Sequence, residues 1–139
     1  MKVMRYCLCI LALATAVCLH AGETLNGKLA VRKNAPATLE TSDHKTIVLD
    51  GDENTMKVLA DPRVNGFDVQ VKGRFASPSK FVIDPSYQHS LLVHQGGKLR
   101  MITYYCDVCN IRDYTPGPCR CCQRETTLEL RDPDDPESK

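Results

Sequence analysis

The stretch TIVLDGDENTMKVLADPRVNGFDVQVKG, residues 46–73, decides the fold. Residues 46–50 are predicted to form a strand, and residues 67–71 alternate strictly between apolar and polar types, which indicates a strand with one buried face. Between them, Asp52 or Asn54 is expected to cap a short helix that Pro62 ends. The stretch therefore predicts a strand, a short helix and another strand.

Further strands are expected on both sides of this stretch. Upstream, residues 24–32 form one strand, and residues 37–41 form a hairpin with the strand at 46–50. Downstream, the predicted strands are residues 81–83, 91–94, 98–105 and 126–130, with Gly96 and Gly97 as the turn of a hairpin. Gly73 is expected to mark a bulge or tight bend.

This order of elements resembles a small OB-type Greek-key barrel, in which a helix lies between the third and fourth strands. The resemblance covers about residues 25–93, and a β-sandwich or an irregular β-barrel would give a similar pattern. The predicted fold class is mainly β: an OB-like barrel with one short helix, plus a C-terminal β-hairpin. The predicted division is a barrel at 22–97, the hairpin at 98–131 and an acidic, disordered tail at 132–139.

Residues 1–21 have the parts of a secretory signal peptide. Lys2 and Arg5 precede an uncharged run, and Ala21 is followed by Gly22 at one plausible cut, with Ala14-Thr15-Ala16 as an earlier alternative. The run is shorter than the roughly 20 apolar residues of a membrane-spanning helix, so an anchor is disfavoured. We therefore expect an exported, periplasmic or secreted protein without a transmembrane segment in its mature chain.

The charge balance argues against nucleic acid as a partner. Of 18 Lys and Arg residues, removal of Lys2 and Arg5 leaves 16 against 17 Asp and Glu, a net charge of −1. No basic excess remains to contact phosphates, and the chain has no Trp. A nucleic-acid-binding OB protein is therefore the least favoured of the functions considered.

Five cysteines gather near the C-terminus. Three others, Cys7, Cys9 and Cys18, lie in the predicted signal peptide, and residues 22–105 contain none. The five are Cys106, Cys109, Cys119, Cys121 and Cys122. Cys106 with Cys109, and Cys119 with Cys122, form two C-x-x-C pairs, and two such turns can supply four thiolates to one tetrahedral ion.

We predict that these four cysteines bind zinc, with iron or copper as alternatives. Cys121 is an alternative ligand or an extra thiol beside the metal. Plain disulfides remain a competing interpretation, although five cysteines cannot all pair within one chain. His89 and His94 are possible further ligands, and His44 is expected in a turn.

The paired turns resemble a zinc-ribbon or rubredoxin-like knuckle pair. The longer motif YCDVCxIRxYTPGxCxCCQ, within residues 102–131, resembles a signature of uncharacterised exported bacterial proteins. That resemblance implies a bacterial envelope protein and no activity.

No phosphate-binding glycine loop, nucleophile elbow or haem motif is recognised in the sequence, so a non-enzymatic role is the leading hypothesis. In that hypothesis a structural zinc ion holds the C-terminal hairpin shut, and the surface of the protein binds an unknown protein or small ligand. The alternative is an envelope thiol-redox or copper-handling protein that uses Cys121.

Overall fold

The structure is a computed structural model that describes residues 22–135. It is mainly β, with 47% strand and 12% helix, as predicted. The predicted signal peptide and residues 136–139 of the predicted tail lie outside the described residues.

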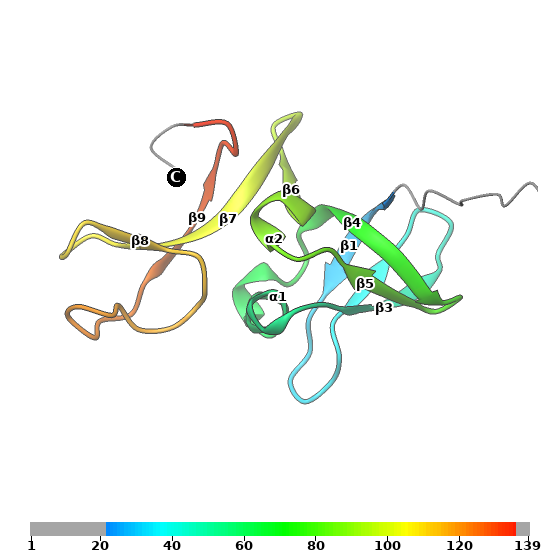
Figure 1. Ribbon diagram of the computed structural model, residues 1–139, viewed down its shortest axis with the longest axis horizontal. Coiled ribbons are helices and arrows are strands. Elements are labelled where there is room, and N and C mark those ends of the chain that lie inside the picture. The colour runs from blue at the N-terminus through cyan, green and yellow to red at the C-terminus, as the bar shows by residue number, and fades with distance from the viewer. Residues whose placement is uncertain (1–21, 136–139) are drawn as a thin grey trace, which may run out of the picture.

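Five strands close into a barrel (Figure 1). They are β1 (Glu23–Ala30), β2 (Thr38–Glu40), β3 (Thr46–Asp50), β4 (Asp68–Ser77) and β5 (Lys80–Ile83). The circuit runs β1-β2-β3-β5-β4 and returns to β1, with only the β3–β5 pair parallel. This closed barrel, with a short helix between β3 and β4, is consistent with the predicted OB-like fold.

The helix α1 (Glu53–Leu59) follows β3, as the sequence predicts. Asp52 caps it, because its Oδ1 accepts a hydrogen bond of 2.8 Å from the Thr55 backbone N–H. The buried residues of α1 are Thr55, Val58 and Leu59. A single 3-10 turn, η1 (Pro62–Val64), comes next and is capped by Asp61.

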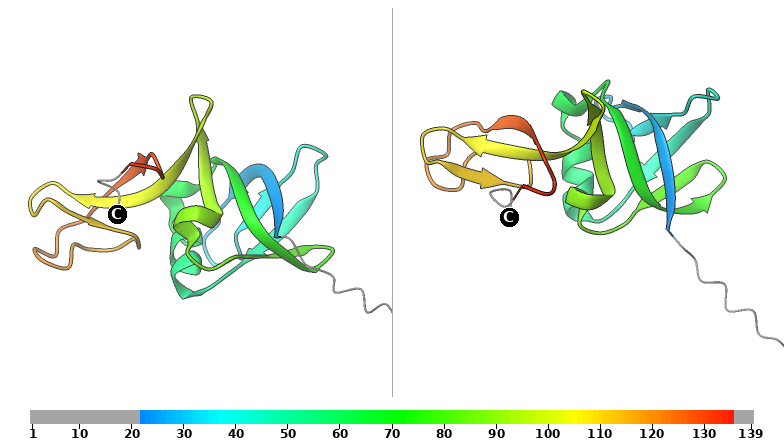
Figure 2. Two further views of the ribbon diagram at one scale, coloured as in Figure 1. Left: turned by 45° about the horizontal axis from the view of Figure 1, so that its top comes forward. Right: turned by 90° about the horizontal axis from the view of Figure 1, so that it is seen from above.

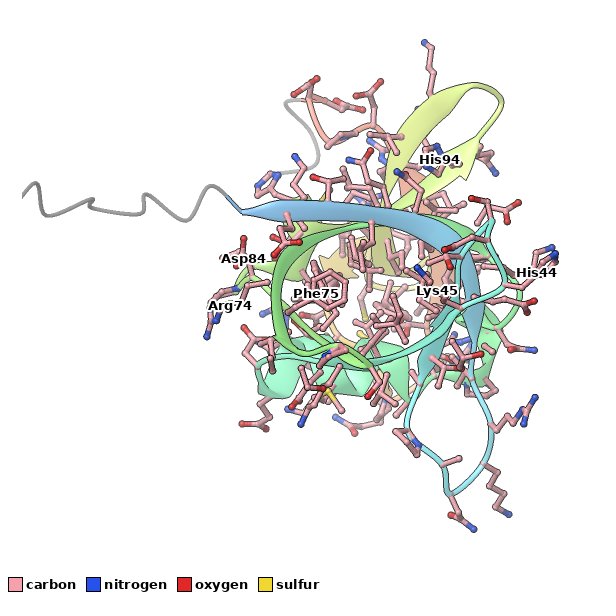
Figure 3. The ribbon with its side chains drawn as sticks, turned by 90° about the vertical axis from the view of Figure 1, so that its right-hand side faces the viewer. His44, Lys45, Arg74, Phe75, Asp84 and His94 are labelled. Atoms are coloured by element: carbon pink, nitrogen blue, oxygen red, sulfur yellow. The ribbon has the colours of Figure 1, made fainter. Side chains whose placement is uncertain are left out.

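The barrel interior follows from the alternation of its strands. Leu29, Leu39, Leu49, Val69 and Phe81 come from five different strands, and each is at most 1% exposed. In Figure 3 the barrel is seen from the end at which Phe75 lies within the ring of strands. Phe75 packs edge-on against Phe81, with 5.1 Å between ring centroids.

The bulge expected at Gly73 lies elsewhere in β4. The register shifts between Phe75 and Ser77, whereas Gly73 pairs regularly with Ile83. A Cβ at Gly73 would lie 2.0 Å from the Val82 carbonyl oxygen. Glycine is therefore needed there for the close approach of β4 and β5, and the extra residue is accommodated nearer the turn.

The chain then leaves the barrel through a hairpin. A helical turn, α2 (Tyr87–Ser90), leads into β6 (Leu91–Gln95), which pairs with β4, and then into β7 (Lys98–Cys106). Gly96 and Gly97 form the predicted turn, both with positive φ. Figure 2 shows β7 extending to one side of the barrel, where it carries the remaining strands.

Those strands are β8 (Ile111–Asp113) and β9 (Thr127–Arg131), which pair with opposite edges of β7. Ile102 and Tyr104 of β7 are fully buried in the main hydrophobic core, and Leu128 and Leu130 of β9 pack against it. The three-stranded ribbon and the barrel thus share one apolar interior. Among residues 22–135, no helix combines the length and apolar composition needed to cross a membrane.

Candidate metal centre

The first cysteine pair lies on the turn between β7 and β8. Cys106 is the last residue of β7 and pairs with Ile111, so residues 107–110 form the turn between them. Asn110 has a left-handed backbone with φ 53°, and its Oδ1 accepts a 2.6 Å hydrogen bond from the Tyr105 hydroxyl. The turn therefore directs Cys106 and Cys109 to the same side of the hairpin.

The second pair lies on a loop between β8 and β9. Pro118 and Glu125 form an isolated bridge that closes this loop. Within it, the Cys119 N–H donates to the Arg124 carbonyl at 2.7 Å, and the Gln123 N–H donates to the Cys119 carbonyl at 2.9 Å. These bonds fold residues 119–122 into a tight turn of their own.

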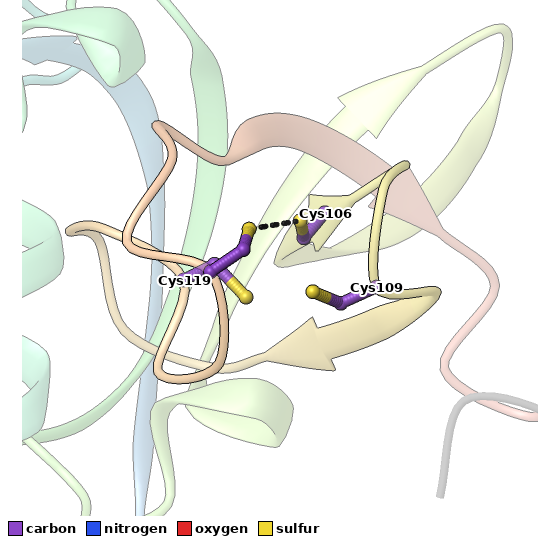
Figure 4. Close-up of side chains that lie close together, drawn as sticks. Cys106, Cys109 and Cys119 are labelled. Atoms are coloured by element: carbon purple, nitrogen blue, oxygen red, sulfur yellow. Dashed lines mark hydrogen bonds between the residues drawn. The ribbon is translucent and has the colours of Figure 1, made fainter.

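The sulfur atoms of Cys106, Cys109, Cys119 and Cys122 all lie within 4.8 Å of one another. The Sγ atoms of Cys106 and Cys122 are 3.5 Å apart. Figure 4 shows the side chains of Cys106, Cys109 and Cys119 converging from the two turns. All four predicted ligands are thus brought together, and all five cysteines of the described chain are free thiols rather than disulfides.

This arrangement fits a tetrahedral cation. With zinc–sulfur bonds of about 2.3 Å, four ligands at tetrahedral corners lie about 3.8 Å apart. The Cys106–Cys122 distance of 3.5 Å is near that value and far above a disulfide bond length of about 2.05 Å, and no pair among the four exceeds 4.8 Å. Cys106 and Cys119 are buried, while Cys109 and Cys122 are partly exposed, so the site has a protected side and an open side.

Local hydrogen bonds make the four thiols unequal. The backbone N–H groups of Cys122 and Cys121 stabilise the Cys119 thiolate and lower the pKa of Cys119 to about 7. Contacts with the thiols of Cys121 and Cys122 raise the pKa of Cys109. Because these thiols do not all ionise without a counter-charge, a bound cation that neutralises the thiolates would stabilise the cluster strongly.

The pKa of Cys106 reflects two opposing effects. A hydrogen bond from the Cys109 backbone favours the Cys106 thiolate, but burial and the neighbouring sulfurs outweigh it and raise the pKa of Cys106. In both pairs, then, backbone N–H groups of the turn donate to the sulfur of the first cysteine. Such bonds are a means of holding negative charge on a ligating sulfur.

Cys121 is exposed and does not belong to the set of four mutually close sulfurs. Its backbone N–H lies 3.4 Å from the Cys119 sulfur, as part of the second turn. Its thiol interacts with that of Cys109. Cys121 is therefore a fifth thiol at the edge of the cluster. Cys122, the second cysteine of its pair, corresponds to Cys109 in the first pair.

The other candidate ligands lie elsewhere. No histidine of the described chain joins the cysteine cluster. His94 Nε2 is 3.0 Å from Asn26 Oδ1 on the barrel, and His44 lies in the β2–β3 turn, 3.5 Å from the Glu40 carboxylate. Near the cysteines, Arg120 forms an ion pair of 3.7 Å with Asp113, and Arg112 forms one of 3.0 Å with Glu129.

Two side chains that were not predicted from the sequence attach the loop of the second turn to the barrel. Arg63 Nη1 donates to the Thr126 carbonyl at 2.7 Å, and the Tyr87 hydroxyl donates to the Tyr114 carbonyl. The sequence predicted only that Pro62 would end the helix, and the structure adds a turn capped by Asp61. Nothing in the sequence indicated which distant carbonyls these side chains would reach.

Comparisons with protein families, with curated proteins and with solved structures find no significant match to this chain. The fold and the site still define a class: a small β-barrel protein with a four-cysteine cluster that could hold a metal ion. The resemblance of the C-terminal motif to exported bacterial proteins stays a prediction.

Proposed function

We propose that this chain is an exported, non-enzymatic protein in which one zinc ion, held by Cys106, Cys109, Cys119 and Cys122, stabilises the ribbon beside an OB-like barrel. The observation that carries the proposal is the convergence of four sulfurs within 4.8 Å from two matching turns. Zinc suits four thiolates in a tetrahedron and adds no redox chemistry. Export is supported by the composition of residues 1–21.

The barrel offers a surface for the binding role. A groove of about 450 Å³ lies between β1, the β2–β3 turn and the ends of β4 and β6. Lys28, Glu40, His44, Asp68 and His94 line it. These mixed charges suit a polar small molecule or a protein surface better than a polyanion, which supports a binding module over a nucleic-acid protein.

The test is metal analysis of the mature protein, expressed with its leader and purified without metal-affinity steps. We expect one zinc ion per chain by elemental analysis, a native mass that includes it, and an N-terminus at Gly22. Cys119→Ser should lose the ion, whereas Cys121→Ser should keep it. A metal-free protein with disulfides among the four cysteines would overturn the proposal.

A second candidate function is thiol redox or copper handling through Cys121. The observation that favours it is the exposed position of Cys121 beside the Cys109 thiol. Copper(I) prefers soft thiolates and accepts fewer of them than zinc does. If Cys121→Ser weakens copper(I) binding but leaves zinc binding unchanged, this second function gains support.

A further inference from the structure

Two residues of the barrel reach the loop that carries the second cysteine pair. Asp61 is buried, and its carboxylate accepts hydrogen bonds of 3.0 Å from the Arg63 backbone N–H and from Arg63 Nε. Arg63 Nη2 also lies 2.9 Å from this carboxylate. The guanidinium of Arg63 is thus held in one orientation, over the ring of Tyr104 with 5.1 Å to its centroid.

From that orientation Arg63 Nη1 donates to the carbonyl of Thr126 at 2.7 Å. Thr126 is itself buried, and its hydroxyl donates to the Gly117 carbonyl at 2.9 Å. Arg63 therefore holds a residue that ties together the two ends of the cysteine loop.

The start of the same segment is held by a different barrel residue. Tyr87 of α2 is 1% exposed, and its hydroxyl donates to the Tyr114 carbonyl. Residues 114–126, which include Cys119 and Cys122, form only an isolated bridge and no strand. The Arg63–Thr126 and Tyr87–Tyr114 hydrogen bonds and the thiol cluster hold this irregular segment, and Tyr114 also packs against the core.

We propose that Arg63 is a positioning residue for the metal centre, and that metal binding and docking of residues 114–126 on the barrel are one coupled equilibrium. This inference rests on the proposed metal site and states how that site is regulated. Arg63 touches no cysteine. It acts by holding the Thr126 end of the segment where Cys119 and Cys122 face Cys106 and Cys109.

The physical basis is conformational entropy. A metal ion that binds a mobile segment must order that segment and close a loop between the two cysteine pairs. When Arg63 and Tyr87 already order its ends, less ordering remains to be done and the affinity for the ion is higher. By linkage, the ion then strengthens the docking by the same factor.

The coupling is also expected to reach the loop at residues 31–36, which contacts residues on either side of Arg63 in the chain. Pro62, which precedes Arg63, lines a cavity of about 690 Å³ together with Ala60 and the loop at residues 31–36. The Asn65 side chain accepts a 2.8 Å hydrogen bond from the Val31 backbone N–H at the base of that loop. Docking of the cysteine segment adds the Thr126 carbonyl to the partners of Arg63 and so stabilises η1, which supports this loop. We therefore expect the loop to be more ordered when metal is bound.

The experiment compares the zinc affinity of the full mature chain with that of Arg63→Gln and Arg63→Lys, by competition with a chromogenic chelator. We expect Arg63→Gln to weaken zinc binding about tenfold and Arg63→Lys to restore part of it. Hydrogen exchange gives the second readout. Zinc should slow amide exchange at residues 31–36 and 61–66 in the native chain but not in Arg63→Gln.

Val58→Ala is the matched control, because Val58 is buried in α1 and its side chain lies in the barrel core. It should loosen the barrel while leaving zinc affinity within about twofold. Equal zinc affinity in Arg63→Gln and the native chain, or zinc-independent exchange at residues 31–36, would overturn the coupling. If the native chain binds no zinc at all, it is the proposed function that fails.

Discussion

Asn110 and Gln123 share a left-handed backbone, with φ of 53° and 60°, and each directly follows the second cysteine of its pair. The two turns therefore end in the same backbone conformation although their sequences differ. A left-handed conformation costs a residue with a Cβ about 1 kcal/mol, and a β-branched residue more. Both turns must keep this conformation for the four sulfurs to converge.

We expect Gln123→Val to destabilise the zinc-loaded protein by about 1–2 kcal/mol, because valine avoids a positive φ. Gln123→Gly should be close to neutral, since the relief in the folded chain is offset by the greater freedom of glycine in the unfolded chain. Chemical unfolding of the two variants in excess zinc checks this. Similar losses for valine and glycine would mean that the Gln123 side chain, and not its backbone, matters.

Gly73→Ala should destabilise the barrel by roughly 3 kcal/mol, because the added Cβ would meet the Val82 carbonyl oxygen at 2.0 Å and force β4 away from β5. The measurement is the midpoint of denaturant unfolding followed by circular dichroism. Gly22→Ala is the control, since the nearest atom to its Cβ is 3.4 Å away. A Gly73→Ala variant as stable as Gly22→Ala would show that the two strands are not so close.

Asp61 should make stability depend on pH. Burial alone raises the pKa of Asp61, but hydrogen bonds from Arg63 outweigh it and bring the pKa below its ordinary value of 3.8. A carboxylate with a lowered pKa stabilises the fold above its unfolded-state pKa, and this contribution is lost as the pH falls below 3.8 toward the folded-state pKa.

We therefore expect the stability difference between the native chain and Asp61→Asn to be constant from about pH 5 upward and to shrink below pH 4. Thermal unfolding in the presence of a chelator measures it, so that release of metal in acid does not contribute. A difference that grows as the pH falls would contradict the lowered pKa.

Alkylation should distinguish Cys121 from the four clustered cysteines. In the zinc-loaded protein, the exposed Cys121 should react quickly with iodoacetamide, while Cys106, Cys109, Cys119 and Cys122 are protected by the ion. Mass spectrometry should then show one modification, and addition of a chelator should allow the other four. Cys121→Ser provides the control, with no rapid modification expected before chelation.

Much of the barrel could be predicted because its determinants are local. Alternation in residues 67–71, the cap at Asp52, the stop at Pro62 and the Gly96-Gly97 turn each act within a few residues of the chain. The prediction of a bulge at Gly73 was wrong because a glycine within a strand can mark either a bulge or a close approach to another backbone. Gly73 serves close packing against Val82, a residue of another strand that the local sequence does not reveal.

The clustering of the four cysteines was predictable for a related reason. A C-x-x-C turn places two sulfurs on one side of a hairpin by local geometry alone. Cys106 and Cys109 can therefore occupy two of the four corners of a tetrahedral site. The role of Cys121 could not be read in this way. Cys121 and Cys122 are neighbours, and the turn in which the Cys119 carbonyl accepts from the Gln123 N–H is what places Cys122 in the cluster.

By itself, then, the sequence determined the strand–helix–strand order, the OB-like class and the four clustered cysteines, because spacing and periodicity control structure over short stretches of chain. Only the tertiary structure decided that β7 joins the ribbon to the barrel core and that Arg63 and Tyr87 hold the cysteine loop. Those contacts join residues far apart in the chain to backbone carbonyls, and any residue type offers a carbonyl, so no local pattern marks them.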